Sequence, residues 1–213
     1  MKRVFLLLFT FCVSVGVTGQ ELRIGAYGGM TLGRTVDNYH YTADFYEGFI
    51  QGAPRAGLSV SCQFENSFDL GLLYYHQNTQ VPTTFYSGGN TFDRQFGLTI
   101  QWFLVDFVAY LVKGSVRPFF GTDFGMGILT LDDQGSHSSR AKFAWGGNLG
   151  LEFAFHKAIS LRLKGDVLYS IKFNSPNPGI NTNTNITAYN SYLHSGLSLG
   201  VIFRFKMHRK KKQ

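Results

Sequence analysis

The feature that most constrains this chain is a strict alternation of side chains between residues 142 and 170. From Phe143 to Phe155 every second residue is bulky and apolar except Gly147, and the residues between them are small or polar. The pattern pauses at residues 156–158 and resumes from Ile159 to Val167. A period of two residues is typical of β-strands with one apolar and one polar face. Each segment is long enough to cross a bilayer at a tilt, which takes about ten residues.

The composition of the two faces favours a membrane environment. One face carries aromatic and branched side chains, and the other mixes glycine with arginine, glutamate and aspartate. A soluble sheet would bury its large residues and cover the other face mainly with Lys, Glu and Thr. Small residues interleaved with opposite charges suit the interior of a narrow barrel whose apolar face meets lipid. We therefore predict a hairpin of a transmembrane β-barrel.

Strand-like segments recur along the rest of the chain and bring the predicted count to eight. The other six are residues 22–33, 55–65, 68–77, 91–103, 116–129 and 189–205. Because apolar faces are expected to meet lipid, Phe96, Ile100 and Trp102 are predicted to point outward. Arg94 falls on that same face, and we place it near the outer rim, where a long side chain can reach water.

Long connections alternate with short turns. The long ones are residues 34–54, 78–90, 130–140 and 173–188. An even strand count with this alternation predicts an all-β, eight-stranded antiparallel up-and-down barrel, with its N-terminus on the periplasmic side. Residues 104–115 depart from the plan, because they are apolar and too long for a short turn. They form either an interfacial helical turn or extensions of the flanking strands.

The two ends of the chain differ from its middle. Lys2 and Arg3 precede an apolar run of about ten residues, and small residues precede Gln20, as in a cleaved secretory signal peptide. That run is too short for a membrane anchor. We predict a signal peptide over residues 1–19, a barrel over 20–205 and a basic periplasmic tail over 206–213.

The net charge of +7 resides at these ends, since residues 20–205 are neutral overall. The high pI therefore does not indicate nucleic-acid binding. Charged residues make up only 15% of the chain, below the roughly 25% of an ordinary soluble domain. Cys62 is the only cysteine outside the signal peptide, so we predict no disulfide.

Three stretches resemble the outer-membrane β-barrel domain family, the OmpA/OmpX-like small barrels. They are RPFFGTDFGMGIL (117–129), WGGNLGLEFAFHKAISLRLKGDVLY (145–169) and LGVIFRF (199–205). The resemblance implies an outer-membrane location and insertion by the barrel-assembly machinery. Phe205 resembles the terminal aromatic residue that this machinery reads, although residues 206–213 follow it here.

No catalytic or metal-binding motif is evident. The six histidines lack metal-ligand spacing. His194 and Ser195 are adjacent on a strand, so they point to opposite faces and cannot form a nucleophile–base pair. We predict no enzymatic activity, no cofactor and no metal.

The polar residues predicted to face inward form the main candidate site. Buried charges require partners, so we expect Glu152 to pair with arginines on neighbouring strands. The interior is either a sealed structural core or a narrow pore, and an eight-stranded barrel favours the first. This interior polar ladder consists of Arg23, Arg55, Glu65, Asp123, Glu152, Arg162, Lys164, Asp166 and Arg204.

The first long connection is rich in aromatic residues, which form either a binding surface or an aromatic girdle at the membrane interface. They are Tyr39, Tyr41, Phe45, Tyr46 and Phe49. We predict a monomeric structural or surface-interaction protein that contacts lipids and lipopolysaccharide, with a loop ligand that the sequence does not identify. The alternatives are a narrow channel or hydrophobic-ligand conduit and, third, a soluble lipocalin-type barrel.

Overall fold

The computed structural model describes residues 21–38, 45–65, 67–87, 89–133, 136–171 and 191–206. The predicted signal peptide, the loop over 173–188 and the tail beyond Lys206 lie outside these residues. The strands are β1 (Glu21–Thr31), β2 (Arg34–Asn38), β3 (Phe45–Ile50), β4 (Pro54–Phe64), β5 (Phe68–Ser87), β6 (Asn90–Tyr110), β7 (Val116–Asp133), β8 (Ser136–Phe153), β9 (Ile159–Ile171) and β10 (Ser191–Lys206). In these ranges no helix is long and apolar enough to cross a membrane.

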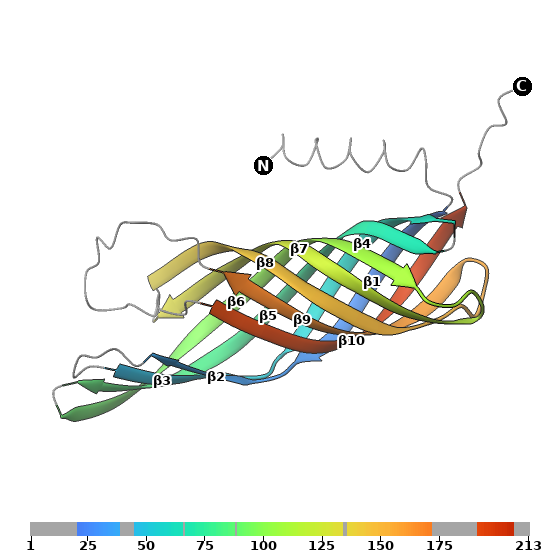
Figure 1. Ribbon diagram of the computed structural model, residues 1–213. Helices are drawn as coiled ribbons and strands as arrows, with labels where there is room; N and C mark the ends of the chain where they lie inside the picture. Colours follow the sequence, from blue (N-terminus) through green and yellow to red (C-terminus); the bar gives the residue numbers. More distant parts are fainter. Residues whose placement is uncertain are drawn as a thin grey trace, which may run out of the picture.

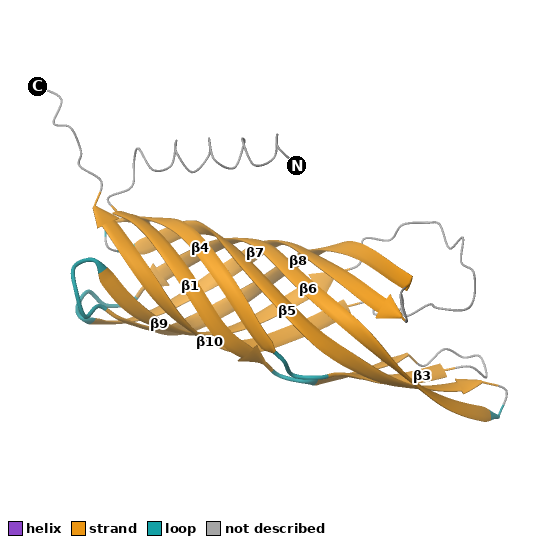
Figure 2. Ribbon diagram, turned by 180° about the vertical axis from the view of Figure 1, so that it is seen from behind, coloured by secondary structure: helices purple, strands orange, loops and turns teal. Residues whose placement is uncertain are grey.

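Eight of the strands close into a ring. Hydrogen bonds link them in the order β5-β4-β1-β10-β9-β8-β7-β6, and β6 pairs back to β5. Every pairing is antiparallel, including the one between β1 and β10 that joins the two ends of the chain. Figures 1 and 2 show this ring from opposite sides. The predicted eight-stranded up-and-down barrel is confirmed.

The two ends of the barrel differ in their connections. Residues 111–115 and 154–158 form short turns at one end, which we call the turn end, and β4 and β5 meet at the same end with residues 65 and 67 in turn conformation. The opposite end, which we call the loop end, carries the β1–β4, β5–β6, β7–β8 and β9–β10 connections. Residues 21 and 206 pair at the turn end.

Three of the predicted loops contain strand. Residues 78–90 continue β5 and begin β6, which pair up to Ser87 and Asn90. Residues 130–140 likewise continue the β7–β8 hairpin. In the predicted loop 34–54, β2 pairs with β3, and β3 adds to the distal part of β5 through Phe45–Tyr86 to Gly48–Thr83. These sheet extensions project beyond the ring at the loop end (Figure 1).

The structure also decides between the alternatives for residues 104–115. β6 continues through Tyr110 in register with β5 and β7, and only residues 111–115 form the turn. The flanking strands therefore extend further, as one of the two alternatives proposed. The reason is visible in the pattern, since Val105 and Phe107 face outward while Asp106 faces inward.

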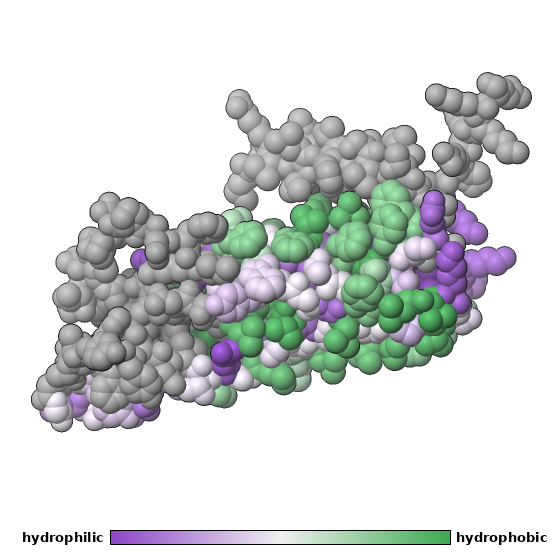
Figure 3. Space-filling view, viewed as in Figure 1, coloured by the Kyte–Doolittle hydropathy of each residue, from purple (hydrophilic) through white to green (hydrophobic). Residues whose placement is uncertain are grey.

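Near the turn end, the outer surface is apolar all round the ring. Outward side chains such as Leu58, Phe124, Leu149 and Leu199 are each about half exposed or more. Figure 3 shows apolar side chains gathered over the barrel on the face in view. Soluble monomers rarely expose apolar surface on this scale, and a band of it around a closed barrel is what a bilayer requires.

Towards the loop end, β5 and β6 exchange the polarity of their faces. The side chains of Phe96, Ile100 and Trp102 are at most 2% exposed and point into the barrel. Their outward neighbours are polar, with Thr99 donating a hydrogen bond to Asn78 at 2.9 Å. The prediction that this apolar face meets lipid is wrong. Here the wall extends past the apolar band, so water rather than lipid determines which face turns inward.

Candidate functional site: the filled lumen

The candidate site is the inner surface of the barrel, whose lumen is filled by buried side chains over most of its length. Its polar part comprises six basic and six acidic residues: Arg23, Arg55, Arg117, Arg162, Lys164 and Arg204 against Glu21, Asp69, Asp106, Asp123, Glu152 and Asp166. All are buried except Arg204, which is partly buried. Opposite charges in equal number keep the interior neutral, as burial in low dielectric requires.

The largest cluster lies nearest the turn end and centres on Glu152 of β8. Its carboxylate accepts hydrogen bonds from Arg23, Arg117 and Arg162, on β1, β7 and β9. Arg117 and Arg162 are its direct partners across the β7–β8 and β8–β9 pairings. The register of the ring therefore brings two arginines to one glutamate. We call Arg23, Asp69, Tyr110, Arg117, Glu152 and Arg162 the Glu152 network.

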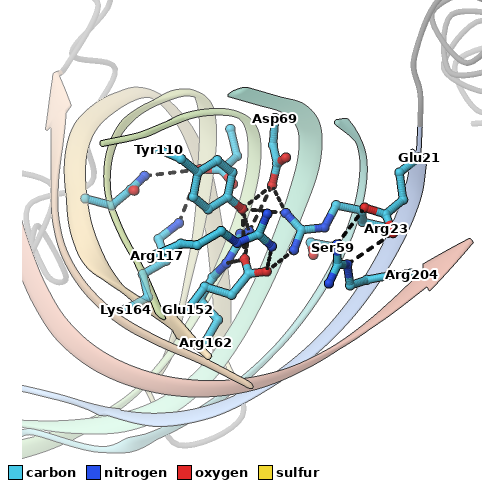
Figure 4. A network of polar contacts seen from close by, with 12 residues as sticks. Glu21, Arg23, Ser59, Asp69, Tyr110, Arg117, Glu152, Arg162, Lys164 and Arg204 are labelled. Carbon is cyan, nitrogen blue, oxygen red and sulfur yellow. Dashed lines mark hydrogen bonds and ion pairs between the residues drawn. The ribbon is translucent and has the colours of Figure 1, made fainter. Parts of the chain in front are cut away.

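Asp69 and Tyr110 complete this network. Asp69 pairs with Arg23 at 2.5 Å and with Arg162 at 2.9 Å. The Tyr110 hydroxyl lies 2.7 Å from Asp69 and 2.8 Å from Glu152, and its ring lies 4.7 Å from the Arg117 guanidinium. Figure 4 shows these side chains converging from different strands. Each charge thus has partners from several strands, which ties the wall together across the lumen.

A second cluster follows further into the barrel. Lys164 lies 3.3 Å from Asp106 and 3.5 Å from Asp123. Asn148 donates hydrogen bonds to both of these carboxylates, at 3.1 and 2.8 Å. We call Asp106, Asp123, Asn148 and Lys164 the Lys164 cluster.

The next layer is an ion pair between Arg55 and Asp166, which are joined by two hydrogen bonds. Ser198 accepts a further bond from Arg55 at 2.6 Å, and the Tyr75 ring lies 4.3 Å from its guanidinium. Space for this arginine comes from a missing side chain, because a Cβ at Gly196 would lie 2.7 Å from Cζ of Arg55. The glycine at position 196 therefore makes room for the long side chain of Arg55.

Apolar side chains close the lumen towards the loop end. Trp102 packs against His194 at 5.6 Å between ring centroids, and the cluster continues to the base of the sheet extension. We call this group the apolar cluster, and its central members are Ile50, Val81, Phe96, Leu98, Ile100 and Trp102, each at most 5% exposed.

Eight of the nine residues of the predicted polar ladder line the lumen, and Glu65 does not. Glu65 is exposed in the turn after β4 with φ of 49°, so it cannot join the inward face. Arg204 lies at the turn-end rim, where its Nε pairs with Glu21 Oε1 at 3.1 Å. Arg94 is also at a rim, 3.6 Å from Asp133 at the loop end.

The aromatic candidates divide between described and undescribed residues. Tyr39 and Tyr41 lie outside the described residues. Phe45 and Tyr46 belong to β3, not to a loop, and Phe49 on the same strand is 44% exposed. Phe205 lies next to the last residue of β10 and is half exposed on the outer surface.

Several residues of the lumen were not predicted from the sequence. Asp69 was within a predicted strand but was not singled out, and Asp106 and Tyr110 fell in the stretch interpreted as a connection. An available signal was the alternation of Val105 and Phe107 with Asp106, which marks that stretch as strand with an inward carboxylate. Within the described ranges, no group of three or more His, Cys, Asp or Glu residues is arranged to hold a metal ion.

Comparison with known proteins identifies the class through the fold alone. No family model and no curated protein matches this chain. Solved structures of small outer-membrane β-barrels match this chain, and the predicted resemblance to OmpA/OmpX-like barrels is confirmed at the level of fold.

Three structures illustrate the similarity. Neisserial surface protein A has a TM-score of 0.53 and 17% identity, over 88% of this chain and 97% of its own. The N-terminal β-barrel domain of Pseudomonas aeruginosa OprF has a TM-score of 0.51 and 15% identity, over 88% of this chain and 99% of its own. The outer membrane protein OprG of the same organism has a TM-score of 0.53 and 12% identity, over 89% of this chain and 98% of its own. At these identities the fold is shared and no function is transferred.

Proposed function

We propose that this chain is a non-enzymatic outer-membrane protein whose sealed barrel anchors a surface-exposed sheet. The sheet, which we call the distal sheet, consists of β2, β3 and the paired ends of β5 and β6 over residues 79–87 and 90–98. It is the surface that contacts partners outside the cell. The short turns face the periplasm and the loop end faces outward, as in barrels of this architecture.

The observation that carries this proposal is the change of polarity along the outer surface of β5 and β6. Outward residues Phe103, Val105 and Phe107 suit lipid, whereas Gln95 and Thr99 on the same face of β6 suit water. A strand that ended at the membrane surface would not need this change. The polar continuation therefore supports a folded sheet that stands in the aqueous phase.

The distal sheet is anchored by packing. Ile50 of β3, Val81 of β5 and Phe96 of β6 are buried together in the apolar cluster, which continues into the lumen. Near the tip, Phe85 stacks on Phe92 at 5.1 Å, and Phe92 remains 45% exposed. A rigid sheet with an exposed aromatic side chain is suited to macromolecular contact.

The filled lumen favours an anchor over the alternative, a channel or a hydrophobic-ligand conduit. Arg23 and Glu152 at one level, and Ile100 and Trp102 at another, are fully buried. Ions would have to displace paired charges and then an apolar layer, both at considerable cost.

The remaining sequence-based predictions enter the proposal unchanged. Residues 1–19 direct secretion and are removed, residues 20–205 form the barrel, and residues 206–213 form a periplasmic tail. The barrel-assembly machinery inserts the chain as a monomer and reads the β10 end around Phe205. Lipids cover the apolar band, and lipopolysaccharide borders the outward polar residues just above it.

Cysteine labelling on intact cells tests the surface exposure of the distal sheet. We expect Gln95→Cys to react with a membrane-impermeant maleimide, and Val105→Cys on the same face of β6 to remain unlabelled until the membrane is dissolved. The native Cys62 is buried, so the parent protein serves as the background control. Equal protection of the two positions would contradict the proposal.

Two further measurements separate an anchor from a conduit. Purified protein in planar bilayers should show no stable conductance, and cells producing it should take up a hydrophobic probe at the rate of cells without it. A shortened hairpin, with residues 83–94 replaced by Asn-Gly between the paired Pro82 and Gln95, keeps the barrel register. Contact with a surface partner should be lost in this variant, whereas a conduit through the barrel would have kept its activity.

A further inference from the structure

A cavity lies at the turn end of the lumen and is bordered mainly by basic side chains. It has a volume of about 210 Å³ and is lined by Lys113, Gly114, Arg117, Ala154 and Arg204. These residues come from two turns and from the ends of β7 and β10. No acidic side chain is among the lining residues. A water occupies about 30 Å³ in the liquid, so the cavity can hold a small oxyanion together with water.

The Glu152 network beside this cavity carries more positive than negative charge. Among the described residues, its three guanidiniums, of Arg23, Arg117 and Arg162, share two carboxylates, those of Asp69 and Glu152. The opposite imbalance lies further in, where Lys164 and Arg55 contact Asp106, Asp123 and Asp166. With all groups ionised, the lumen is neutral overall but positive towards the cavity. An anion there would balance the local excess.

Arg117 connects the network to the cavity. Its side chain is only 4% exposed, and one terminal nitrogen bonds Glu152. Its Nε is buried without a hydrogen-bond partner among the described residues. A buried N–H of a charged group that lacks a partner is costly, and a guanidinium presents its donors in a planar fork that matches an oxyanion.

The other two cations differ in how their charge is used. Arg204 is bound to Glu21 through Nε and Nη2, at 3.1 and 3.2 Å, so its charge is largely balanced. Lys113 is exposed in the β6–β7 turn and forms no ion pair with the acids that the structure describes. The net positive charge at the cavity therefore comes from Lys113 and Arg117.

We infer that this cavity is an anion-binding site at the periplasmic mouth of the barrel, specific for a phosphate-type oxyanion. Arg117 provides the buried donor and Lys113 the entry charge. The phosphate group comes either from a soluble periplasmic anion or from the headgroup of an anionic phospholipid in the adjacent leaflet. This site is separate from the distal sheet. Its periplasmic location rests on the orientation proposed above, whereas anion binding does not depend on the function proposed for the sheet.

Binding of inorganic phosphate to the full chain in an uncharged maltoside detergent tests the site by isothermal titration calorimetry. Lys113→Gln should weaken binding about two- to fivefold, as expected for an exposed charge. Arg117→Lys keeps the positive charge but removes the planar guanidinium with its several donors, and it should weaken phosphate binding about tenfold or more. Lys157→Gln is the matched control, because Lys157 is an exposed lysine in a neighbouring turn that does not line the cavity.

Native mass spectrometry with added phosphatidylglycerol distinguishes the two sources. In one outcome, the parent protein retains lipid that inorganic phosphate does not displace, and the Lys113→Gln variant loses it. That result supports the site with a lipid headgroup as ligand. Phosphate binding that the variants weaken supports it with a soluble anion. The inference is overturned if neither ligand binds, or if Lys157→Gln weakens binding as much as Lys113→Gln. Should Arg117→Lys fail to fold, Lys113→Gln still decides, because its side chain lies in an exposed turn.

Discussion

The turn-end and loop-end halves of this barrel differ in which face of the wall is polar and which is apolar. Near the turn end, charges fill the lumen and apolar side chains cover the outside. Near the loop end, Phe96, Ile100 and Trp102 fill the lumen, while polar residues such as Thr99 face outward. β5 and β6 pass through both halves without a break in their pairing.

The difference shows that the surrounding medium sets the polarity of each face. In lipid the outside gains nothing from polar groups, so charges are confined to the lumen and must be paired there. In water the ordinary hydrophobic effect buries apolar side chains inside. The position along β6 where the outward residues change from Phe103 to Gln101 marks the upper boundary of the apolar band.

The largest expected effect concerns the charged half. Glu152→Gln removes the carboxylate that Arg23, Arg117 and Arg162 share. Arg23 and Arg162 keep Asp69 as a partner, whereas Arg117 forms no ion pair with Asp69 among the described residues and loses its carboxylate. Breaking a buried ion pair from one side costs about 3–5 kcal/mol. The loss is measured by urea unfolding in lipid vesicles followed by tryptophan fluorescence. Glu65→Gln is the control and should change nothing, because Glu65 is exposed in a turn. Unfolding midpoints that coincide for the two variants would contradict the network's role.

The apolar half should respond nearly as strongly to loss of volume. Ile100→Ala leaves a cavity in a fully buried cluster, and such substitutions cost about 2–5 kcal/mol. Leu58→Ala on the outer surface should cost much less, since lipid can fill the space beside a side chain that is 60% exposed. The same unfolding measurement compares them. If Leu58→Ala lowered the free energy of unfolding more than Ile100→Ala does, the lumen at Ile100 would not be closely packed.

The boundary between the halves can be located with charges on the outer face of β6. Val105→Lys places an ammonium in the apolar band and should destabilise the barrel by about 2–4 kcal/mol. Gln95→Lys, on the same face but in the polar half, should have little effect. Unfolding in vesicles of defined thickness measures both, and similar losses at the two positions would place both of them in lipid.

The smallest effect is expected from the polar surface of the distal half. Thr99 donates a hydrogen bond to Asn78, its direct partner across the β5–β6 pairing. A double-mutant cycle with Thr99→Ala and Asn78→Ala should give a coupling of about 0.2–1 kcal/mol. A coupling above that of the buried ion pairs would show that this surface is shielded from water.

The outer and inner faces of the hairpin β8–β9 were predictable residue by residue. Leu149 and Val167 face outward, while Glu152, Arg162, Lys164 and Asp166 face inward, because alternation is unbroken there and both strands lie mostly within the apolar band. The partners of Glu152 were predictable only in kind. Predicting Arg117 and Arg162 as partners requires the register of two strand pairings. Predicting Arg23 requires the curvature of the ring, which cannot be obtained from sequence spacing.

The errors have a common physical origin. Phe96, Ile100 and Trp102 alternate with polar residues as regularly as the lipid-facing residues do, so the pattern was correct and its orientation was not. Pro82 and Gly89 are of residue types that commonly form turns, yet Pro82 is accommodated in β5, and Gly89, with φ of 82°, lies at the tip of the hairpin. Local turn formers could not reveal that the strands continue beyond the membrane.

The sequence by itself determined that this chain forms long amphipathic antiparallel strands, eight of which suffice for a barrel. A period of two residues fixes which side chains share a face. It does not fix which face is inside, because that depends on whether lipid or water lies outside at that height. The closed ring determines which face of each strand is inside. It also brings together charges as distant in sequence as Arg23 and Glu152.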